Sequence, residues 1–273
     1  MKRAIDTLTF GLVALLMVTT AAVILIPLGY AIVMSFEPRQ YMGGFPPPGL
    51  SLRWYQSFFQ SPYYMNGLRT SLILALSASI ISATLGLLAA LAIAMSNLPG
   101  RSALAALLLS PLIVPGVVVG FSLLMFFAAL GLNGSPVTLL IAHVLLTLPY
   151  TIRTSLAAVN GISPRLYDAA LSLGATEGQA LRKVIVPLAR TGIATGFVFA
   201  FCFSLDDIAV TIFLTSPSTT TLPVALVANM KANFDVTIAA ASTMLMLFAL
   251  VVMIVLDRLV GLDAVMGKGL YRN

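Results

Sequence analysis

Charged side chains are scarce in this chain: Asp, Glu, Lys and Arg together make up 9% of its 273 residues. In a water-soluble domain about a quarter of the residues are charged, so the composition excludes that class. Hydrophobic residues make up 59% of the chain. The composition therefore predicts a membrane protein.

Cysteine and histidine each occur only once. The lone cysteine, Cys202, excludes an internal disulfide and lies in an apolar run, so we expect it to pack against other side chains. His143 has no cysteine or acidic cluster nearby, which favours a buried, hydrogen-bonded histidine over a metal ligand. We predict no metal site and no catalytic residue. The basic residues behind the net charge of +6 are dispersed in short loops, so nucleic-acid binding is not expected.

Apolar stretches between charged residues predict six transmembrane helices, because a helix needs about 20 apolar residues to cross a bilayer. They lie between Asp6 and Glu37, between Arg69 and Arg101, on either side of "GLNGSP" (131–136) within the uncharged run 102–152, at 191–216, and at 236–256. Pro111 and Pro115 are expected to interrupt the third span. We expect an all-α fold with a single transmembrane domain over residues 1–273.

Small residues four positions apart let membrane helices approach closely. The pairs with this spacing are Gly116 with Gly120 and Gly192 with Gly196. We expect both pairs to mark helix contacts.

Lysine and arginine are unequally divided between the two sides of the predicted membrane. The side that holds both termini has most of the 15 basic residues. Those on the other side are Arg39, Arg53, Arg69 and Lys231. Because basic residues are enriched in cytoplasmic loops, both termini and the loop 154–190 are predicted to be cytoplasmic, and the loop 37–66 extracytoplasmic.

The N-terminal apolar run raises a second possibility, a cleaved signal peptide. The apolar core of a signal peptide has about 7 to 15 residues, and the run 7–36 is longer, so we expect a retained first helix. In the loop that follows, the prolines of "FPPPGLSLRWYQSFFQ" impose an extended path. The aromatic residues after them favour a helix anchored at the membrane surface. They are Trp54, Tyr55, Phe58 and Phe59.

The segment "YDAALSLGATEGQALRKVIVPLA" (167–189) is polar for such a chain. Ser163 and Pro164 predict a helix start, and Gly174 can adopt a positive φ and end that helix. Thr176 and Gln179 have capping-box spacing for a second short helix that runs up to Pro187. The apolar positions are Leu166, Ala169, Ala170 and Leu173 in the first helix, and Ala180, Leu181, Val184 and Ile185 in the second. These signals predict short helices that meet at a glycine corner, and a plain surface hairpin is the alternative interpretation.

The spacing in this segment resembles the "EAA" loop of the integral-membrane subunits of ATP-binding-cassette importers. That pattern is Glu-Ala-Ala, three residues, Gly, nine residues, Ile, one residue and Leu-Pro. The residues that follow it here are Asp168, Ala169, Ala170, Gly174, Val184, Val186 and Pro187. Asp replaces Glu, and Val replaces both Ile and Leu.

The resemblance implies a type I importer permease in a bacterial plasma (inner) membrane, with this loop as the coupling loop to an ATPase. By resemblance, Asp168 offers a carboxylate to a basic group, Ala169 and Ala170 allow close approach, and Gly174 forms the corner. The implied partners are a second permease subunit, two ATPase subunits, an extracytoplasmic solute-binding protein and membrane lipid. This chain is then not an enzyme and binds no cofactor, since ATP and Mg²⁺ belong to the partner ATPase.

A stretch near the end of the chain, "GLDAVMGKGL" (261–270), looks like a phosphate-binding loop but does not fit its pattern. Five residues separate Gly261 from Gly267 where the pattern has four, and Gly269 stands where Ser or Thr should bind magnesium. We therefore expect no nucleotide site there.

Asp206 and Asp207 are the most costly residues in the predicted fifth span. A charged Asp at the centre of a membrane helix costs about 2.5 to 3.5 kcal/mol, so such residues usually face a cavity or a partner. Adjacent helical positions point about 100° apart, so the two cannot both face one cavity. We expect one to line a pathway while the other packs against a polar group. The alternative is that both are hydrogen-bonded within the bundle and are structural.

The segment "SLDDIAVTIFLTSPSTTTLP" (204–223) resembles the spermidine/putrescine importer permeases, and the likeness extends from "LRWYQSFF" through the last span. It implies that Asp206 and Asp207 serve a cationic solute. A self-contained secondary carrier or channel, with the acidic pair as an ion or proton site, is the second hypothesis. A membrane enzyme is the third.

Overall fold

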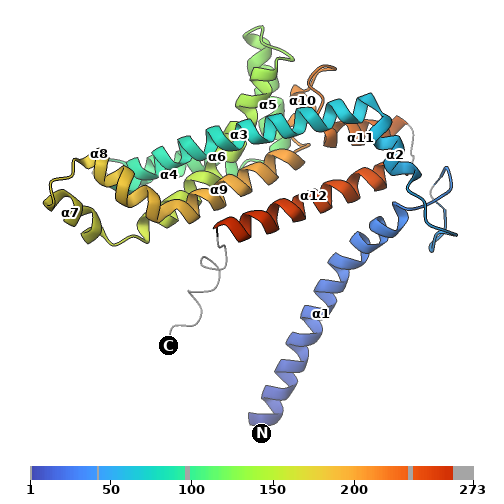
Figure 1. Cartoon of the computed structure of the whole chain (residues 1–273), viewed down its shortest axis with the longest axis horizontal. Coiled ribbons are helices and arrows are strands. Elements are labelled where there is room, and N and C mark those ends of the chain that lie inside the picture. Colours follow the sequence, from blue (N-terminus) through green and yellow to red (C-terminus); the bar gives the residue numbers. More distant parts are fainter. Residues whose placement is uncertain (1, 42, 96–98, 233–235, 261–273) are drawn as a thin grey trace. The chain divides into compact units, whose positions relative to one another are not determined.

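The computed structural model describes residues 2–41, 43–95, 99–232 and 236–260, and within these ranges the regular elements are all helical. The phosphate-loop lookalike at 261–270 lies outside them. The elements are α1 (Lys2–Met34), α2 (Arg53–Gln60), α3 (Pro62–Met95), α4 (Arg101–Leu109), the 3₁₀ turn η1 (Ser110–Leu112), α5 (Gly116–Ala129), α6 (Pro136–Asn160), α7 (Pro164–Ser172), α8 (Glu177–Ala180), the π turn η2 (Leu181–Ile185), α9 (Val186–Asp206), α10 (Thr211–Leu214), α11 (Leu222–Ala232) and α12 (Thr237–Val260) (Figure 1).

The predicted spans can be compared with the helices of the described residues. Five of these helices are long and apolar enough to cross a membrane: 9–34, 62–95, 136–160, 177–206 and 237–255. A sixth span is possible if α4 with η1 and α5, which meet at an angle of 98°, count as one. The all-α prediction is confirmed, and the bend in the third span falls beside Pro111 and Pro115 as expected.

The fifth span differs from its predicted limits of 191–216. It begins at Glu177, because α8, η2 and α9 form one continuous helix, and it ends at Asp206. We call the polar segment 167–189 the polar loop. Its second short helix is therefore the first part of this span and does not stop at Pro187. The acidic pair lies at a helix end and not inside a helix.

The chain divides into two compact units. Unit 1 comprises residues 1–62 and 226–248, and unit 2 comprises residues 63–225 and 249–273. The expectation of one domain over 1–273 stays a prediction.

Unit 1 contains the predicted aromatic helix, but two of its aromatic side chains are buried. Trp54 and Phe58 are 7% and 1% exposed, and the indole Nε1 of Trp54 donates to the carbonyl oxygen of Glu37 at 2.7 Å. Trp54 also packs against Val236 and Ala240. The prediction of a membrane-surface anchor is wrong for these two residues, since their rings stabilise the unit from inside, while Phe59 is 55% exposed.

An ion pair between a buried carboxylate and a half-buried guanidinium lies at the start of the loop after α1. Arg39 donates to both carboxylate oxygens of Glu37 at 2.6 Å, and the Glu37 side chain is fully buried. This hydrogen-bonded guanidinium holds the pKa of Glu37 below its usual value. Charge-assisted pairs of this kind are among the stronger hydrogen bonds in proteins.

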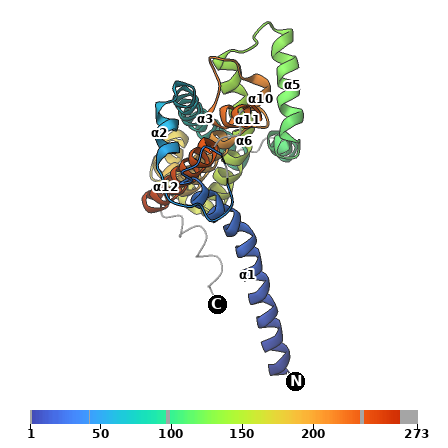
Figure 2. The ribbon, with the colours of Figure 1, turned by 90° about the vertical axis from the view of Figure 1, so that its right-hand side faces the viewer.

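Unit 2 is built on α3, α6 and α9, which run side by side (Figures 1 and 2). Glycines create the close contacts between them: a side chain at Gly86 of α3 would collide with Thr151 of α6, and one at Gly192 or Gly196 of α9 would collide with the same segment of α6. The predicted Gly192/Gly196 contact is confirmed. Helices without side chains at the crossing can pack backbone to backbone, which favours a fixed arrangement of these spans.

Candidate functional site

The glycine corner of the polar loop has the predicted backbone geometry. Gly174 has a φ of 88°, its N–H donates to the Leu171 carbonyl, and the Ala175 N–H donates to the Ala170 carbonyl. This pair of bonds is the Schellman arrangement, which satisfies the last carbonyls of a helix when a glycine follows it. Local backbone hydrogen bonds at Gly174 and Ala175 are therefore enough to end α7.

The start of α8 is fixed by reciprocal bonds. Thr176 Oγ1 accepts from the Gln179 N–H at 3.3 Å, and the Gln179 side chain accepts from the Thr176 N–H at 3.1 Å. The predicted capping box is confirmed. At the start of α7, Ser163 occupies the N-cap position ahead of Pro164, but its side chain makes no capping bond.

The Val-x-Val-Pro end of the pattern coincides with the π turn. Pro187 has no N–H, and its ring would crowd the carbonyl of Lys183 in a regular α-helix. The helix instead forms a wider π turn over Leu181–Ile185, where the Val186 N–H donates to the Leu181 carbonyl. Val184 lies in this turn and Pro187 at the start of α9. Such turns relieve a local break without ending the helix.

The two faces of the polar loop have different surroundings. Tyr167 and Leu181 pack against a cluster of Val159, Ile185 and Ala189, which holds the loop to the helices of unit 2. The apolar positions predicted for α7 point away from that cluster: Leu166 is 47% exposed and Leu173 is 89% exposed. An apolar stripe that is open to solvent in a single chain is a candidate surface for another protein.

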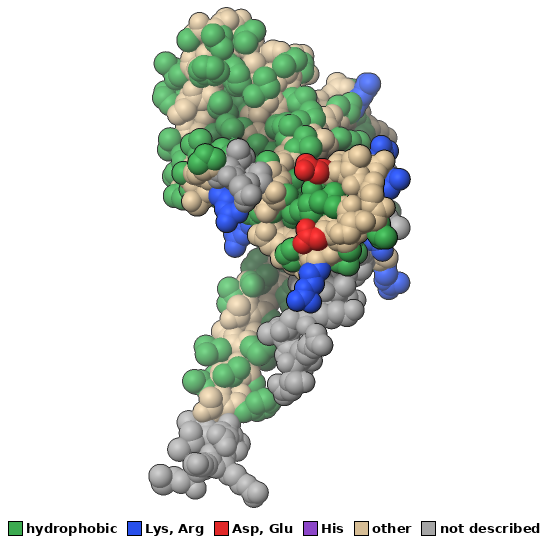
Figure 3. Space-filling model, turned by 90° about the vertical axis from the view of Figure 1, so that its left-hand side faces the viewer, with side chains coloured by type: hydrophobic (Ala, Val, Ile, Leu, Met, Phe, Trp, Pro, Cys, Tyr) green, Lys and Arg blue, Asp and Glu red, His purple; other side chains and the backbone are tan. Residues whose placement is uncertain are grey.

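Charged residues lie on the same loop as this open stripe. Asp168, Ala169 and Gly174 are exposed and Ala170 is half-buried. Figure 3 shows acidic and basic side chains interspersed with apolar ones at the end of unit 2 where α7 and α8 lie. The residues of the predicted coupling pattern therefore gather on one accessible loop.

The second candidate site is the break that ends α9. Asp207 is extended, with φ of −66° and ψ of 125°. Its Oδ2 accepts from the Val210 N–H at 3.1 Å, the Thr211 N–H at 3.0 Å and the Thr211 hydroxyl at 2.8 Å. This carboxylate caps the following short helix α10. Asp207 is therefore the member of the acidic pair that packs against polar groups.

Asp206 is placed differently from Asp207. It is the last residue of α9, its side chain is exposed, and its carboxylate makes no hydrogen bond or ion pair within the described residues. The sequence expectation that the two acids differ in their surroundings is met. The coupling pattern and the acidic pair lie at opposite ends of the helix Glu177–Asp206.

Buried hydrogen bonds from α6 connect to the break. His143 is fully buried, as predicted, with Nδ1 2.7 Å from Ser204 Oγ and Nε2 2.9 Å from Thr211 Oγ1. Sequence reasoning identified His143 as a buried, hydrogen-bonded residue but did not identify its partners. No local signal marks them, because Ser204 and Thr211 meet His143 only through folding.

The segment after the break is also packed against α5. A side chain at Gly120 would collide with Phe213 and with the backbone of Ala209 and Val210, and one at Gly116 would contact Ala209. The predicted Gly116/Gly120 contact is confirmed. Close approach of α5 therefore holds the chain just beyond Asp207.

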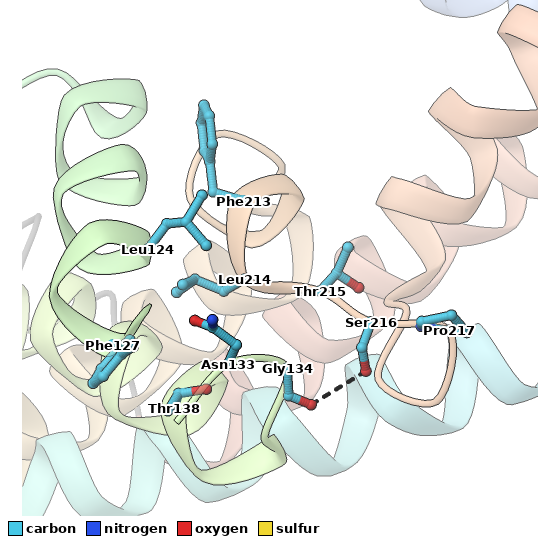
Figure 4. Close-up of a pocket in the computed structure, with 10 residues that line it drawn as sticks. All are labelled: Leu124, Phe127, Asn133, Gly134, Thr138, Phe213, Leu214, Thr215, Ser216 and Pro217. Carbon is cyan, nitrogen blue, oxygen red and sulfur yellow. Dashed lines mark hydrogen bonds between the residues drawn. The ribbon is translucent and has the colours of Figure 1, made fainter. Parts of the chain in front are cut away.

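A cavity of about 390 Å³ lies beside α10. Figure 4 shows residues from α5, the loop before α6, the start of α6, α10 and the segment after α10 around it, with Ser216 Oγ donating to the Gly134 carbonyl at 3.2 Å. The lining residues are Leu124, Phe127, Asn133, Gly134, Thr138, Phe213, Leu214, Thr215, Ser216 and Pro217. None of them is charged, so the cavity is distinct in chemistry from the acidic break.

Comparison with known proteins places these features in a family. Residues 82–262 match the family described as "Binding-protein-dependent transport system inner membrane component". The chain is 30% identical over 248 residues to the spermidine/putrescine transport system permease protein PotC of Shigella flexneri, covering 91% of this chain and 93% of that protein. It is 28% identical to the putrescine transport system permease protein PotI of Escherichia coli K12, covering 72% and 73%.

A solved structure has the same fold. A chain of a bacterial ABC transporter involved in the import of the acidic polysaccharide alginate superposes with a TM-score of 0.71 at 18% identity, covering 91% of this chain and 95% of that chain. The family match and the 30% identity to PotC favour the importer subunit over the secondary carrier or channel and over the membrane enzyme.

Proposed function

The chain belongs to the binding-protein-dependent transport system inner membrane component family, and from this we propose that it forms the pathway for a small cationic solute, of the polyamine class, in an ATP-driven importer. It is a multi-pass protein of the bacterial inner membrane, and its relatives PotC and PotI are permease subunits. The proposal concerns the solute and the residues that serve it.

The observation that carries the cation proposal is the Asp206 carboxylate, which has no partner among the residues that the structure describes. A carboxylate in the membrane interior costs several kcal/mol unless it faces water or a partner. Asp206 is exposed at a helix end, and within the described residues its carboxylate makes no hydrogen bond. An ammonium group of a passing solute is a suitable transient partner. Asp207 is already bonded to Thr211, so it is not free to take that role.

The same proposal assigns ATP hydrolysis and solute delivery to other subunits. The open stripe of α7 docks on an ATPase subunit, which supplies ATP and Mg²⁺, and Asp168 meets a basic group there. A second permease subunit, a second ATPase subunit and an extracytoplasmic solute-binding protein complete the importer. The support for this division is the solvent-exposed Leu173 beside the Gly174 corner, on the loop that matches the coupling pattern.

The test compares Asp206→Asn with Asp207→Asn in proteoliposomes that contain the importer assembled with its partner subunits. Uptake of labelled spermidine should fall strongly for Asp206→Asn, while assembly and ATP hydrolysis are retained. Asp206→Glu, which keeps the charge, should transport better than Asp206→Asn. Asp207→Asn should chiefly lower the stability of the complex, because weakening one member of a buried polar network costs about 1 to 3 kcal/mol.

Two results would contradict the proposal. Undiminished spermidine uptake by Asp206→Asn would remove the pathway carboxylate. Competition of uptake by a neutral sugar, but not by putrescine, would remove the polyamine class.

A further inference from the structure

One side chain bonds to both sides of the α9 break. Ser204 is three residues before Asp207 and Thr211 is four residues after it, and His143 contacts both hydroxyls through opposite ring nitrogens. All three residues are at most 3% exposed. Because buried polar groups are paired with one another and not with bulk water, the direction of each of these hydrogen bonds follows from which of the three side chains can donate and which can accept.

The hydrogen atoms in this chain can be assigned. A hydroxyl has one hydrogen to donate, and Thr211 Oγ1 gives it to Asp207 Oδ2 at 2.8 Å. Thr211 Oγ1 must therefore accept from His143, which requires a hydrogen on Nε2. In the neutral ring Nδ1 is then an acceptor for the Ser204 hydroxyl. The direction of donation runs from Ser204 through His143 and Thr211 to Asp207.

We infer that His143 is a positioning residue that fixes the α9 break and thereby holds the Asp206 carboxylate in place for the solute. The ring connects the last turn of α9 to α10, while the glycines of α5 hold the same segment from another side. Without the ring, Asp207 still caps α10, but the capped segment has no bond to α6 or α9 through these hydroxyls. The role of Asp206 rests on the function proposed above, whereas the state of His143 does not.

The first experiment needs no transport. His143 is the only histidine in the chain, so the permease, labelled with ¹⁵N-histidine and purified with a tag that lacks histidine, gives imidazole signals from one residue. We expect a neutral ring protonated at Nε2. Thr211→Val should shift the Nε2 signal, and Ser71→Ala should not, although it removes a buried hydrogen bond that Ser71 Oγ accepts from the Leu222 N–H. A ring protonated at Nδ1 alone would overturn the inference.

The second experiment measures the dependence of uptake on spermidine concentration. His143→Ala should raise KM at least about fivefold, the effect expected when one buried hydrogen bond is lost, with ATP hydrolysis retained. His143→Gln keeps a donor toward Thr211 and should be milder than His143→Asn, which reaches only toward Ser204. Ser71→Ala is again the control and should leave KM unchanged.

A double variant distinguishes an effect of His143 on the position of Asp206 from a general loss of structure. In an Asp206→Asn background the carboxylate that His143 positions is absent, so His143→Ala should raise KM no further. Independent effects of the two changes would overturn the inference, as would an unchanged KM in His143→Ala. If the wild-type importer takes up no polyamine, the proposed solute is wrong, and the ¹⁵N measurement still decides the bonding of His143.

Discussion

Replacement of Gly174 by valine tests the loop corner through backbone conformation alone. Gly174 has a φ of 88°, and a Cβ added there would meet no atom within 4 Å. The cost is therefore conformational: a left-handed conformation costs an L-residue about 1 to 2 kcal/mol, and more for a β-branched side chain. A cost of that size lowers the population of the native corner by about 5- to 30-fold.

The assay is ATP-driven uptake per assembled complex, measured beside the ATPase rate. Gly174→Val should insert and assemble but lose most coupled uptake, and Gly174→Asn should retain more, because Asn tolerates a positive φ. Gly178→Val is the matched control, since Gly178 also has open space around it but no positive φ. Wild-type uptake in Gly174→Val, or an equal loss in Gly178→Val, would refute the reasoning.

Further predictions concern topology and pH. A reporter fused after Ala175 should read cytoplasmic and one fused after Ser218 extracytoplasmic, and the opposite pattern would invert the assigned orientation. Arg39 holds the pKa of Glu37 below its usual 4.5, so the stabilisation is complete above that value and is lost as the pH falls through the lowered pKa. The melting temperature of the detergent-solubilised protein should therefore fall on acidification, and Glu37→Gln should flatten this dependence. Equal acid sensitivity of both proteins would count against the ion pair.

The parts that sequence predicted correctly depend on neighbours in the chain. The existence of the apolar spans, though not all of their limits, follows from the scarcity of charges along them, and the corner at Gly174 follows from a glycine at the end of an amphipathic helix. The capping box at Thr176 is equally local. Each of these features depends on one continuous stretch of the chain, so no tertiary contact was needed to find it.

The parts that sequence missed depend on contacts between distant segments. Two acids in an apolar run look the same whether the helix continues or stops, and α9 ends where Asp207 caps α10 and His143 binds Thr211. Trp54 looks like a surface aromatic until Glu37 offers it a carbonyl. The continuity of α8 with α9 was missed because Pro187 normally ends a helix, and a π turn accommodates it here.

That continuity makes the helix Glu177–Asp206 a lever with the polar loop at one end and the acidic break at the other. Its 30 residues give a length of about 45 Å at about 1.5 Å per residue. A tilt of about 10° about the loop end carries the other end through about 8 Å over that length, a displacement larger than the diameter of an ammonium group. Because α3 and α6 are packed against this helix, they would tilt with it, and a small rotation imposed on the loop would then move the Asp206 carboxylate into or out of reach of a solute.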